Sequence, residues 1–230
     1  MVEPRRATDS WNEGGQFAVA GTIITVAQQK GGAGKTTLTA HLAVAFKDAG
    51  KSVALVDIDP QQSLSNWFRL RQELYEDAED GMVLSRTEGW RSRSEVDKLA
   101  RGFDIVLVDT PPHAETETRV AVRGASIAVV PCQPSPMDVW ATYPVLELAQ
   151  KEGTPALMVL NRVPARANLT DRMMADIKRL GASIARTRLG NRILFASALA
   201  EGRGAAEAKP LSIATQEVKR LSKEILRKVE

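Results

Sequence analysis

The sequence predicts an α/β fold in which a mostly parallel central sheet is covered by helices on both faces. Short β-branched and apolar segments alternate along the chain with segments that carry apolar residues at helical spacing. Strands that alternate with helices pair in parallel, and the continuous apolar character of the strands indicates burial on both faces. The expected strands are 22–27, 52–57, 103–109, 126–131 and 156–161, with a weaker candidate at 182–187.

The length of the chain fits one large domain. A chain of 230 residues can bury roughly 70 to 75% of its unfolded surface in a single core. We expect this domain to span 21–230. Residues 1–20 mix charged residues, Ser and Gly with scattered apolar positions, so we expect a mobile tail in which Trp11 and Phe17 are candidate anchors for a partner.

A glycine-rich loop follows the first expected strand. The helical pattern over 38–46 comes directly after this loop and is expected to end at Gly50. Glycines let consecutive backbone N–H groups converge on phosphate oxygens, and the positive end of the following helix points at the same anion. Strand, loop and helix together predict a phosphate-binding loop (P-loop) and a P-loop NTPase fold. The nucleotide-binding candidates are Gly31, Gly32, Ala33, Gly34, Lys35, Thr36 and Thr37.

The loop carries two lysines. Lys35 is expected to reach the outer phosphates, and the hydroxyl of Thr36 is expected to hold Mg²⁺. The common form of the motif, G-x-x-x-x-G-K-[ST], requires glycine at position 29, but this chain has Gln29 and then Lys30. A cation beside a triphosphate can stabilise the charge that develops there during the reaction. Lys30 and Lys35 are therefore both catalytic candidates.

Two later strands deliver carboxylates. Strand 52–57 runs into the sequence Asp57-Ile58-Asp59-Pro60-Gln61, and strand 103–109 ends in Asp109. An aspartate at a strand end is also ordinary turn chemistry. Open parallel sheets, however, bind ligands at the carboxyl ends of their strands, so we expect these acids to face the phosphate-binding loop. The polar region 58–101 between these strands is expected to begin with a helix capped by Ser63.

The loop, the D-x-D-P-Q segment and the strand ending in Asp109 together resemble the ParA/MinD family of ATPases. This resemblance implies ATP and Mg²⁺ as cofactors, and a dimer that encloses two nucleotides, in which Lys30 touches the partner's phosphates. It also implies that Asp59 supports attack by water. The implied metal-site residues are Thr36, Asp59 and Asp109, the last of these acting through water. Asn161, at the end of strand 156–161, is similar to the asparagine that family members use on adenine, although turn chemistry explains it equally well.

The charge is unevenly distributed. Residues 151–230 contain 16 Lys or Arg against 8 Asp or Glu, whereas residues 1–150 contain 15 against 20. A basic region suits binding to the phosphates of nucleic acid, and a solvated basic surface is the simpler alternative. The resemblance implies nonspecific DNA binding by the ATP dimer, and no helix-turn-helix segment precedes the P-loop, as in the short ParA type. The candidate DNA contacts are Arg188, Arg192 and Arg220.

The C-terminal segment and the cysteine count help to separate the possible classes of protein. From Ser212 onward one narrow apolar stripe lacks aromatic anchors, so we expect a helix that docks on the sheet rather than on a membrane. The single cysteine, Cys132, favours a reducing cytoplasm and cannot supply paired thiolates for a cluster. Two alternatives remain open: a MinD-like membrane-associated positioning ATPase, and a metabolic ligase resembling dethiobiotin synthetase.

The leading expectation is thus a Mg²⁺-dependent ATPase that forms an ATP-sandwich homodimer and binds nucleoid DNA nonspecifically. It would position or segregate a cargo, which is a chromosome or plasmid locus or a protein cluster. A ParB-like protein or another cargo adaptor would stimulate hydrolysis and release the dimer. The resemblance places this protein in the cytoplasm, on the nucleoid.

Overall fold

The computed structural model describes residues 20–75, 80–88, 91–112, 115–165 and 183–229. Within these ranges, seven strands form one parallel sheet in the order β3-β2-β4-β1-β5-β6-β7. The predicted α/β class is confirmed, and the tail expected at 1–20 lies, apart from its last residue, outside the described residues. The strands are β1 (Thr22–Val26), β2 (Val53–Asp57), β3 (Met82–Arg86), β4 (Ile105–Asp109), β5 (Ile127–Cys132), β6 (Ala156–Leu160) and β7 (Ser183–Ile184).

One strand was not predicted. β3 lies within the polar region 58–101, at the edge of the sheet, where it pairs only with β2. An edge strand that is covered on fewer sides needs fewer apolar residues, and β3 accordingly ends in Ser85 and Arg86. The weak candidate at 182–187 shrinks to the two residues of β7.

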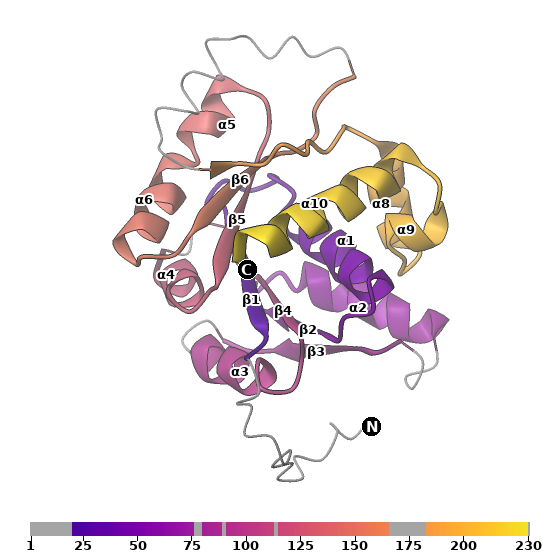
Figure 1. Ribbon diagram of the computed structural model, residues 1–230, viewed down its shortest axis with the longest axis horizontal. Helices are drawn as coiled ribbons and strands as arrows, with labels where there is room; N and C mark the ends of the chain where they lie inside the picture. Colours follow the sequence, from indigo (N-terminus) through magenta and orange to yellow (C-terminus); the bar gives the residue numbers. More distant parts are fainter. Residues whose placement is uncertain (1–19, 76–79, 89–90, 113–114, 166–182, 230) are drawn as a thin grey trace.

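Helices cover both faces of the sheet (Figure 1). The first face carries α1 (Lys35–Asp48), α2 (Ser63–Leu74), α8 (Ile193–Ala200), α9 (Ala205–Ala208) and α10 (Ile213–Val229). The second face carries α3 (Ser92–Leu99), α4 (Glu115–Arg123) and α6 (Tyr143–Lys151). The short helix α5 (Pro136–Trp140) follows β5 at the carboxyl edge of the sheet.

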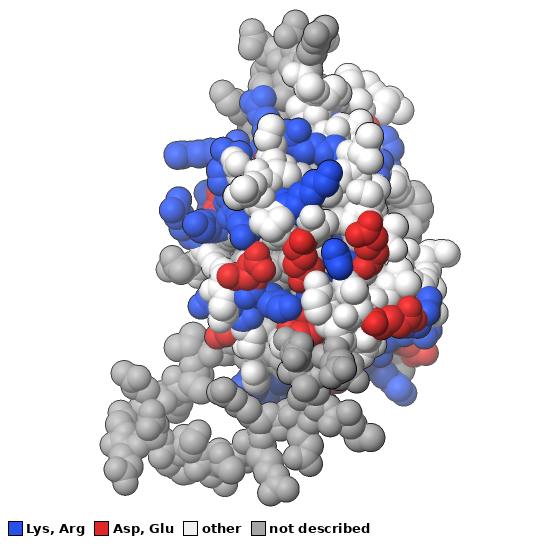
Figure 2. Space-filling view, turned by 90° about the vertical axis from the view of Figure 1, so that its right-hand side faces the viewer, with Lys and Arg blue, Asp and Glu red and all other residues white. Residues whose placement is uncertain are grey.

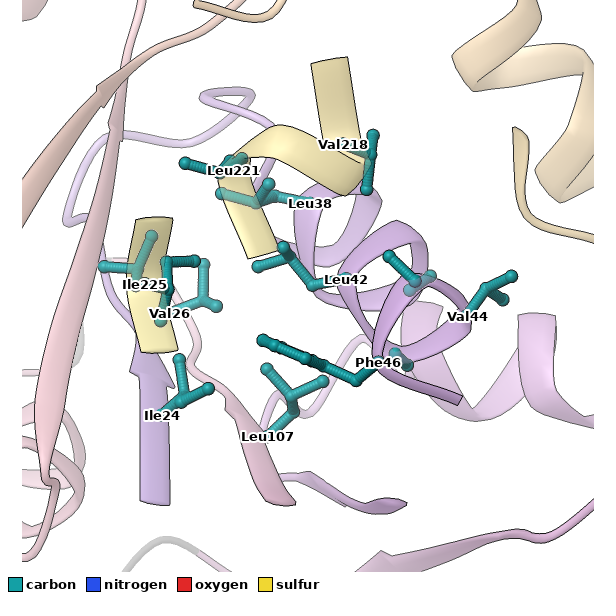
Figure 3. Packing of buried hydrophobic residues seen from close by; sticks show 14 of the residues in the cluster. Ile24, Val26, Leu38, Leu42, Val44, Phe46, Leu107, Val218, Leu221 and Ile225 are labelled. Atoms are coloured by element: carbon teal, nitrogen blue, oxygen red, sulfur yellow. The ribbon is translucent and has the colours of Figure 1, made fainter. Parts of the chain in front are cut away.

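The main core lies between the sheet, α1 and α10 (Figure 3). Phe46 of α1 points toward Leu107 of β4, Leu42 of α1 points into the same core, and Ile225 of α10 lies over Val26 of β1. Val218, Leu221 and Ile225 are all buried, so the apolar stripe of the C-terminal helix packs into the core of the protein. The expectation that this helix docks on the domain is confirmed. None of the helices in the described ranges is long and apolar enough to cross a bilayer.

His41 ties α1 to the two helices beside it. Its Nε2 lies 2.9 Å from the carbonyl oxygen of Phe195, and its Nδ1 accepts a 3.1 Å hydrogen bond from the N–H of Ala205. Both contacts are satisfied only by the neutral ring with its proton on Nε2. Burial lowers the pKa of His41 to about 4, against weaker opposing effects of the Phe195 carbonyl and Glu207.

A buried ionic cluster joins α1, α2 and α9 to the segment before β3. The guanidinium of Arg71, which is fully buried, donates to Asp80 at 2.6 and 2.5 Å and to Glu207 at 2.8 and 2.7 Å. Lys47 of α1 adds a 2.7 Å hydrogen bond to Asp80. These contacts fix the second half of α2, whereas the first half leads into the candidate site.

Candidate nucleotide-binding site

The sequence motifs meet at the carboxyl edge of the sheet. β1 lies between β4 and β5, so the P-loop that follows β1 is flanked by the segments that follow those two strands. In the strand register Asp109 is opposite both Val26 and Asp57. Parallel pairing therefore brings the P-loop and the two predicted acidic segments together, as expected for a ligand site at this edge.

The P-loop adopts a conformation that requires glycine. Gly32 and Gly34 have φ angles of 74° and 91°, in the left-handed region. A Cβ atom at Gly34 would also lie 2.6 Å from Nδ2 of Asn161. α1 starts immediately after Gly34, so its N-terminal N–H groups lie at the loop, where an anion binds well.

Asn161 braces the P-loop from the end of β6. Its Nδ2 donates a 2.9 Å hydrogen bond to the carbonyl oxygen of Ala33, and its Oδ1 accepts one from the N–H of Arg162. The role predicted from the resemblance, contact with adenine, stays a prediction. The structure shows in addition that Asn161 holds the P-loop in position, a role that the sequence did not indicate.

Two glutamines that the sequence reasoning missed also hold the loop. Gln133 donates through Nε2 to the carbonyl oxygen of Gly32 at 3.2 Å. Gln28 accepts a 3.4 Å hydrogen bond from the N–H of Lys30 and donates to the carbonyl oxygen of Pro131 at 3.3 Å. Gln133 directly follows β5, and Gln28 lies two residues after the end of β1, so both are at the edge where the site lies. That placement is the signal that could have identified them.

Thr36 and Asp109 form the corner that fits a metal ion. The hydroxyl of Thr36 donates a 2.6 Å hydrogen bond to Oδ2 of Asp109. The other oxygen, Oδ1, is buried and has no hydrogen-bond partner among the described residues. Burial, and to a smaller degree the nearby Asp57 and Asp59, raise the pKa of Asp109 to about 7, although Thr36 and Lys35 oppose the shift. A buried carboxylate oxygen left without a partner beside a hydroxyl fits a hard cation such as Mg²⁺.

Lys35 lies at the same corner and is buried. Burial lowers the pKa of Lys35, against the opposing charges of Asp109 and Asp59. A bound phosphate would bring negative charge next to the ammonium group and so favour its charged form. The structure thus brings together Lys35, Thr36 and Asp109 as predicted from the sequence.

The two aspartates after β2 differ in their surroundings. Asp57 is buried, and its Oδ2 accepts hydrogen bonds from the N–H and hydroxyl of Ser65 at 2.9 and 2.6 Å. It thereby caps α2, whereas Ser63, the expected cap, is the first residue of the helix. Asp59 is only partly buried, and its Oδ1 accepts a 2.9 Å hydrogen bond from the N–H of Gln61. Asp57 is therefore structural, and Asp59 is the acid at the pocket.

A pocket of about 500 Å³ opens beside the P-loop. It is lined by the loop glycines, Lys35, Thr36 and Thr37, and by Asp59. α2 and α8 also line it, and their apolar contribution comes from Trp67, Leu70, Leu199 and Ala200. The volume suits a ligand of nucleotide size, and the lining contains both polar and apolar groups.

Lys30 does not line this pocket. Its Nζ lies 2.8 Å from Oδ1 of Asp138 on α5, and 41% of the lysine side chain is exposed. The second oxygen of Asp138 accepts a hydrogen bond from the hydroxyl of Ser135. The lysine at the start of the loop is therefore directed toward α5 and away from the phosphate pocket of its own chain.

Comparisons with known proteins identify the family of the chain. Residues 24–205 match the CobQ/CobB/MinD/ParA nucleotide binding domain, which spans most of the chain. The chain belongs to the ParA/MinD family of ATPases. The maintenance of carboxysome distribution protein A of Halothiobacillus neapolitanus is 30% identical to this ATPase over 186 residues, which cover 78% of this chain and 84% of the relative. The chromosome-partitioning ATPase Soj of Thermus thermophilus is 26% identical, with 90% of this chain and 96% of Soj covered.

Solved structures share the fold of this ATPase. The cell division ATPase MinD of Pyrococcus furiosus superposes with a TM-score of 0.75 at 24% identity, covering 90% of this chain and 99% of MinD. Cobyrinic acid a,c-diamide synthase of Mycobacterium smegmatis superposes with a TM-score of 0.70 at 19% identity, covering 90% and 94%. A cell division ATPase and a biosynthetic enzyme thus use the same architecture.

The three arginines predicted to contact DNA are not equivalent in this ATPase. Arg188 and Arg220 are exposed. Arg192, in contrast, donates to both oxygens of Glu217, at 2.9 and 2.5 Å. Its positive charge is therefore paired within the protein. Glu217 and Glu224 of α10 also accept hydrogen bonds from the N–H groups of Gly190, Arg186 and Thr187, which fixes the loop that carries Arg188.

Proposed function

We propose that this ATPase forms a homodimer around two ATP molecules, binds DNA nonspecifically in that state, and positions or segregates an intracellular cargo. Hydrolysis stimulated by a partner protein would then release the dimer. The observation that carries the proposal is the direction of Lys30. A lysine at the start of the P-loop that points away from its own pocket is available to the phosphates of a second copy.

The pocket residues support a mechanism based on charge. Hydrolysis of ATP requires stabilisation of the negative charge on the transferred phosphoryl group and an oriented water molecule. Lys35 would contact the outer phosphates, and Thr36 with Asp109 would hold Mg²⁺, which, when bound, neutralises charge on the phosphates. Asp59 lines the same pocket, and we assign to it the orientation of the attacking water. Lys30 of the second copy would complete the charge neutralisation.

The surface supports contact with DNA. Figure 2 shows Lys and Arg side chains gathered in the upper part of one face of the molecule, with Asp and Glu in a band across its middle. Arg188, on its fixed loop, and Arg220, on α10, are exposed cations of the basic region 151–230. Phosphate contacts of this kind are independent of base sequence and sensitive to salt. This chemistry supports the proposed nonspecific binding along the nucleoid.

The cargo is proposed from the relatives. They include proteins named for carboxysome distribution and for chromosome partitioning. The shared activity is spatial positioning, and the carried object differs. We therefore propose a cargo linked through an adaptor, which is ParB-like if the cargo is a chromosome or plasmid locus.

The burial of the C-terminal stripe favours this function over the MinD-like alternative. An amphipathic helix can bind a membrane only if its apolar face is free, and that of α10 is packed on α1. A metabolic ligase on this fold would hydrolyse ATP only with a small-molecule substrate. Turnover that DNA and an adaptor stimulate, in the absence of any such substrate, distinguishes the proposed function.

Binding to a plasmid of unrelated sequence tests the DNA contact. We expect binding with the non-hydrolysable analogue AMPPNP and much weaker binding with ADP. The logarithm of the affinity should fall by about 0.9 per phosphate contact for each tenfold rise in salt. Arg188→Ala and Arg220→Ala should each weaken binding, whereas Arg69→Ala, which removes an exposed arginine from α2, should not. Equal binding with ADP and AMPPNP, or a flat response to salt, would refute DNA binding by the ATP state.

A further inference from the structure

The short helix α5 exposes two large apolar side chains. Met137 is 65% exposed and Trp140 is 55% exposed. Pro136, one position before Met137, is exposed as well. We call Pro136, Met137 and Trp140 the α5 face.

The chain around the α5 face is unusually free of charge. From Pro131 to Leu146 the sequence contains one charged residue, Asp138. Asp138 is buried and paired with Lys30, so no other charge of this segment stands beside the exposed apolar groups. Single exposed apolar residues are normal, but Trp and Met without charged neighbours are typical of the centre of protein interfaces.

The position of α5 connects this surface to the nucleotide site. β5, which leads into α5, is the parallel neighbour of β1, which leads into the P-loop, so both segments leave the same edge of the sheet. The 2.8 Å contact between Lys30 and Asp138 joins them directly. Asp138 lies between Met137 and Trp140 in the sequence of α5, so a second copy that Lys30 reaches from its present position would also lie near α5.

We propose that the α5 face is the apolar part of the interface with a second copy of this chain in the ATP state. This inference rests on the proposed function, because it uses the role of Lys30 across a dimer. Trp140 is the central anchor and Met137 an adaptable neighbour, since aromatic side chains bury a large area at low entropic cost and Met fills irregular gaps. Asp138, which Lys30 leaves when it reaches a phosphate of the second copy, lies at the polar border of the contact. In a two-fold dimer both copies contribute the same residues.

The cysteine content of the chain makes the proposal easy to test. Cys132 is the only cysteine, and it is 1% exposed. A Met137→Cys variant therefore carries one accessible thiol, placed on the α5 face. Leu211→Cys is the matched control, because Leu211 is 92% exposed in the segment between α9 and α10. The rate of maleimide labelling is measured without nucleotide, with Mg-ADP and with Mg-AMPPNP, and light scattering reports dimer formation in the same samples.

We expect AMPPNP to slow labelling of Met137→Cys at least about tenfold, with no comparable change at Leu211→Cys, since a core interface position excludes solvent. If the dimer forms and labelling at Met137→Cys is unchanged, the α5 face lies outside the interface and the inference fails, while the proposed function stands. If no dimer forms with AMPPNP in the parent protein, the proposed function fails and the inference falls with it. Slow labelling already without nucleotide would also overturn the inference, since the face would then be covered by something else.

A second pair of variants measures the contribution of the anchor. Trp140→Ser should raise the dissociation constant of the AMPPNP dimer at least about tenfold, whereas Leu211→Ser should leave it within about twofold. Both substitutions are at exposed positions, so the far-UV spectrum and the nucleotide affinity of the monomer should stay unchanged. An unaltered dimer in Trp140→Ser contradicts the proposal. So does a defect that appears only when another protein is added, because it would assign the face to a different partner.

Discussion

Nζ of Lys30 lies 2.8 Å from Oδ1 of Asp138, so the first residue of the P-loop is bonded to α5 and not to the pocket of its own chain. The lysine side chain is 41% exposed. The Asp138 side chain is only 9% exposed, so the pair is open to solvent on the lysine side alone. A partly exposed pair of this kind contributes on the order of 1 kcal/mol, so the lysine can exchange Asp138 for a phosphate at small cost.

This exchange predicts the effect of Asp138→Asn. The substitution keeps an acceptor for Ser135 but removes the charge that competes with phosphate for Lys30. We expect the dimer formed with AMPPNP to become tighter, by roughly two- to fivefold, which corresponds to the modest free energy of a partly exposed pair. Analytical ultracentrifugation measures the dissociation constant. A weaker dimer would show that the pair persists in the dimer and supports it.

Asn161 allows a test between loop support and recognition of adenine. Its amide is hydrogen-bonded to Ala33 of the P-loop. If this contact is its main role, Asn161→Ala should weaken ATP and GTP binding by a similar factor, about fivefold for the loss of one hydrogen bond. Calorimetric titration with both nucleotides gives the ratio. A selective loss of ATP affinity, with GTP unchanged, would instead assign Asn161 to the base.

The ionic cluster around Arg71 should be a major determinant of stability. Arg71→Met leaves the buried carboxylate of Asp80 and the partly buried carboxylate of Glu207 without their main partner. Breaking such a cluster costs about 3 to 5 kcal/mol of unfolding free energy. Arg69→Met is the matched control, because Arg69 lies on the same helix and its pair with Glu73 is 65% and 61% exposed. The control should lose less than about 1 kcal/mol in urea unfolding. Equal losses in the two variants would contradict the assigned role of the cluster.

The lowered pKa of His41 predicts a pH dependence of stability. In the unfolded chain the ring titrates near 6.5, whereas burial lowers the pKa of His41 to about 4 in the folded protein. Between these values the unfolded state binds more protons, so the contribution of His41 is fully present above pH 6.5 and is lost as the pH falls toward 4. Between pH 7 and pH 5 the wild-type protein should lose about 2 kcal/mol through this group.

The variant His41→Gln isolates this effect from other titrating groups. Urea unfolding at pH 7 and pH 5 should show a smaller drop in the variant than in the wild type, by about the same 2 kcal/mol. A drop of equal size in both proteins would mean that His41 is not held neutral in the folded state.

The sequence was most informative where local pattern decides the structure. β4, β5 and β6 were predicted within two residues, because interior parallel strands read as unbroken apolar runs. β3 was missed, since an edge strand that ends in Ser85 and Arg86 lacks that pattern. α10 was placed correctly by its apolar stripe, and the structure shows the stripe packed on α1.

Contacts between distant parts of the chain were beyond the reach of the sequence. The motif indicated that Lys30 has a special role, but nothing local indicates that Asp138 is its partner. In the same way, Arg192 looked like a free cation until the fold placed Glu217 beside it. Asp57 and Asp59 are alike in sequence, and only burial and hydrogen bonds separate the helix cap from the pocket acid.

The central claim, that Lys30 acts on the nucleotide of a second copy, is tested most directly by mixing two inactive variants. In Lys30→Ala the missing lysine is required by the partner's site, whereas in Asp59→Ala the missing carboxylate is required by its own site. A mixed dimer therefore contains one complete site, formed by Asp59 of the first subunit and Lys30 of the second. With random pairing of equal amounts in a two-fold dimer, we predict that ATPase activity recovers to about one quarter of the wild-type value. If Lys30 acted within its own chain, neither site would be complete, and a mixture as inactive as the separate variants would contradict the account.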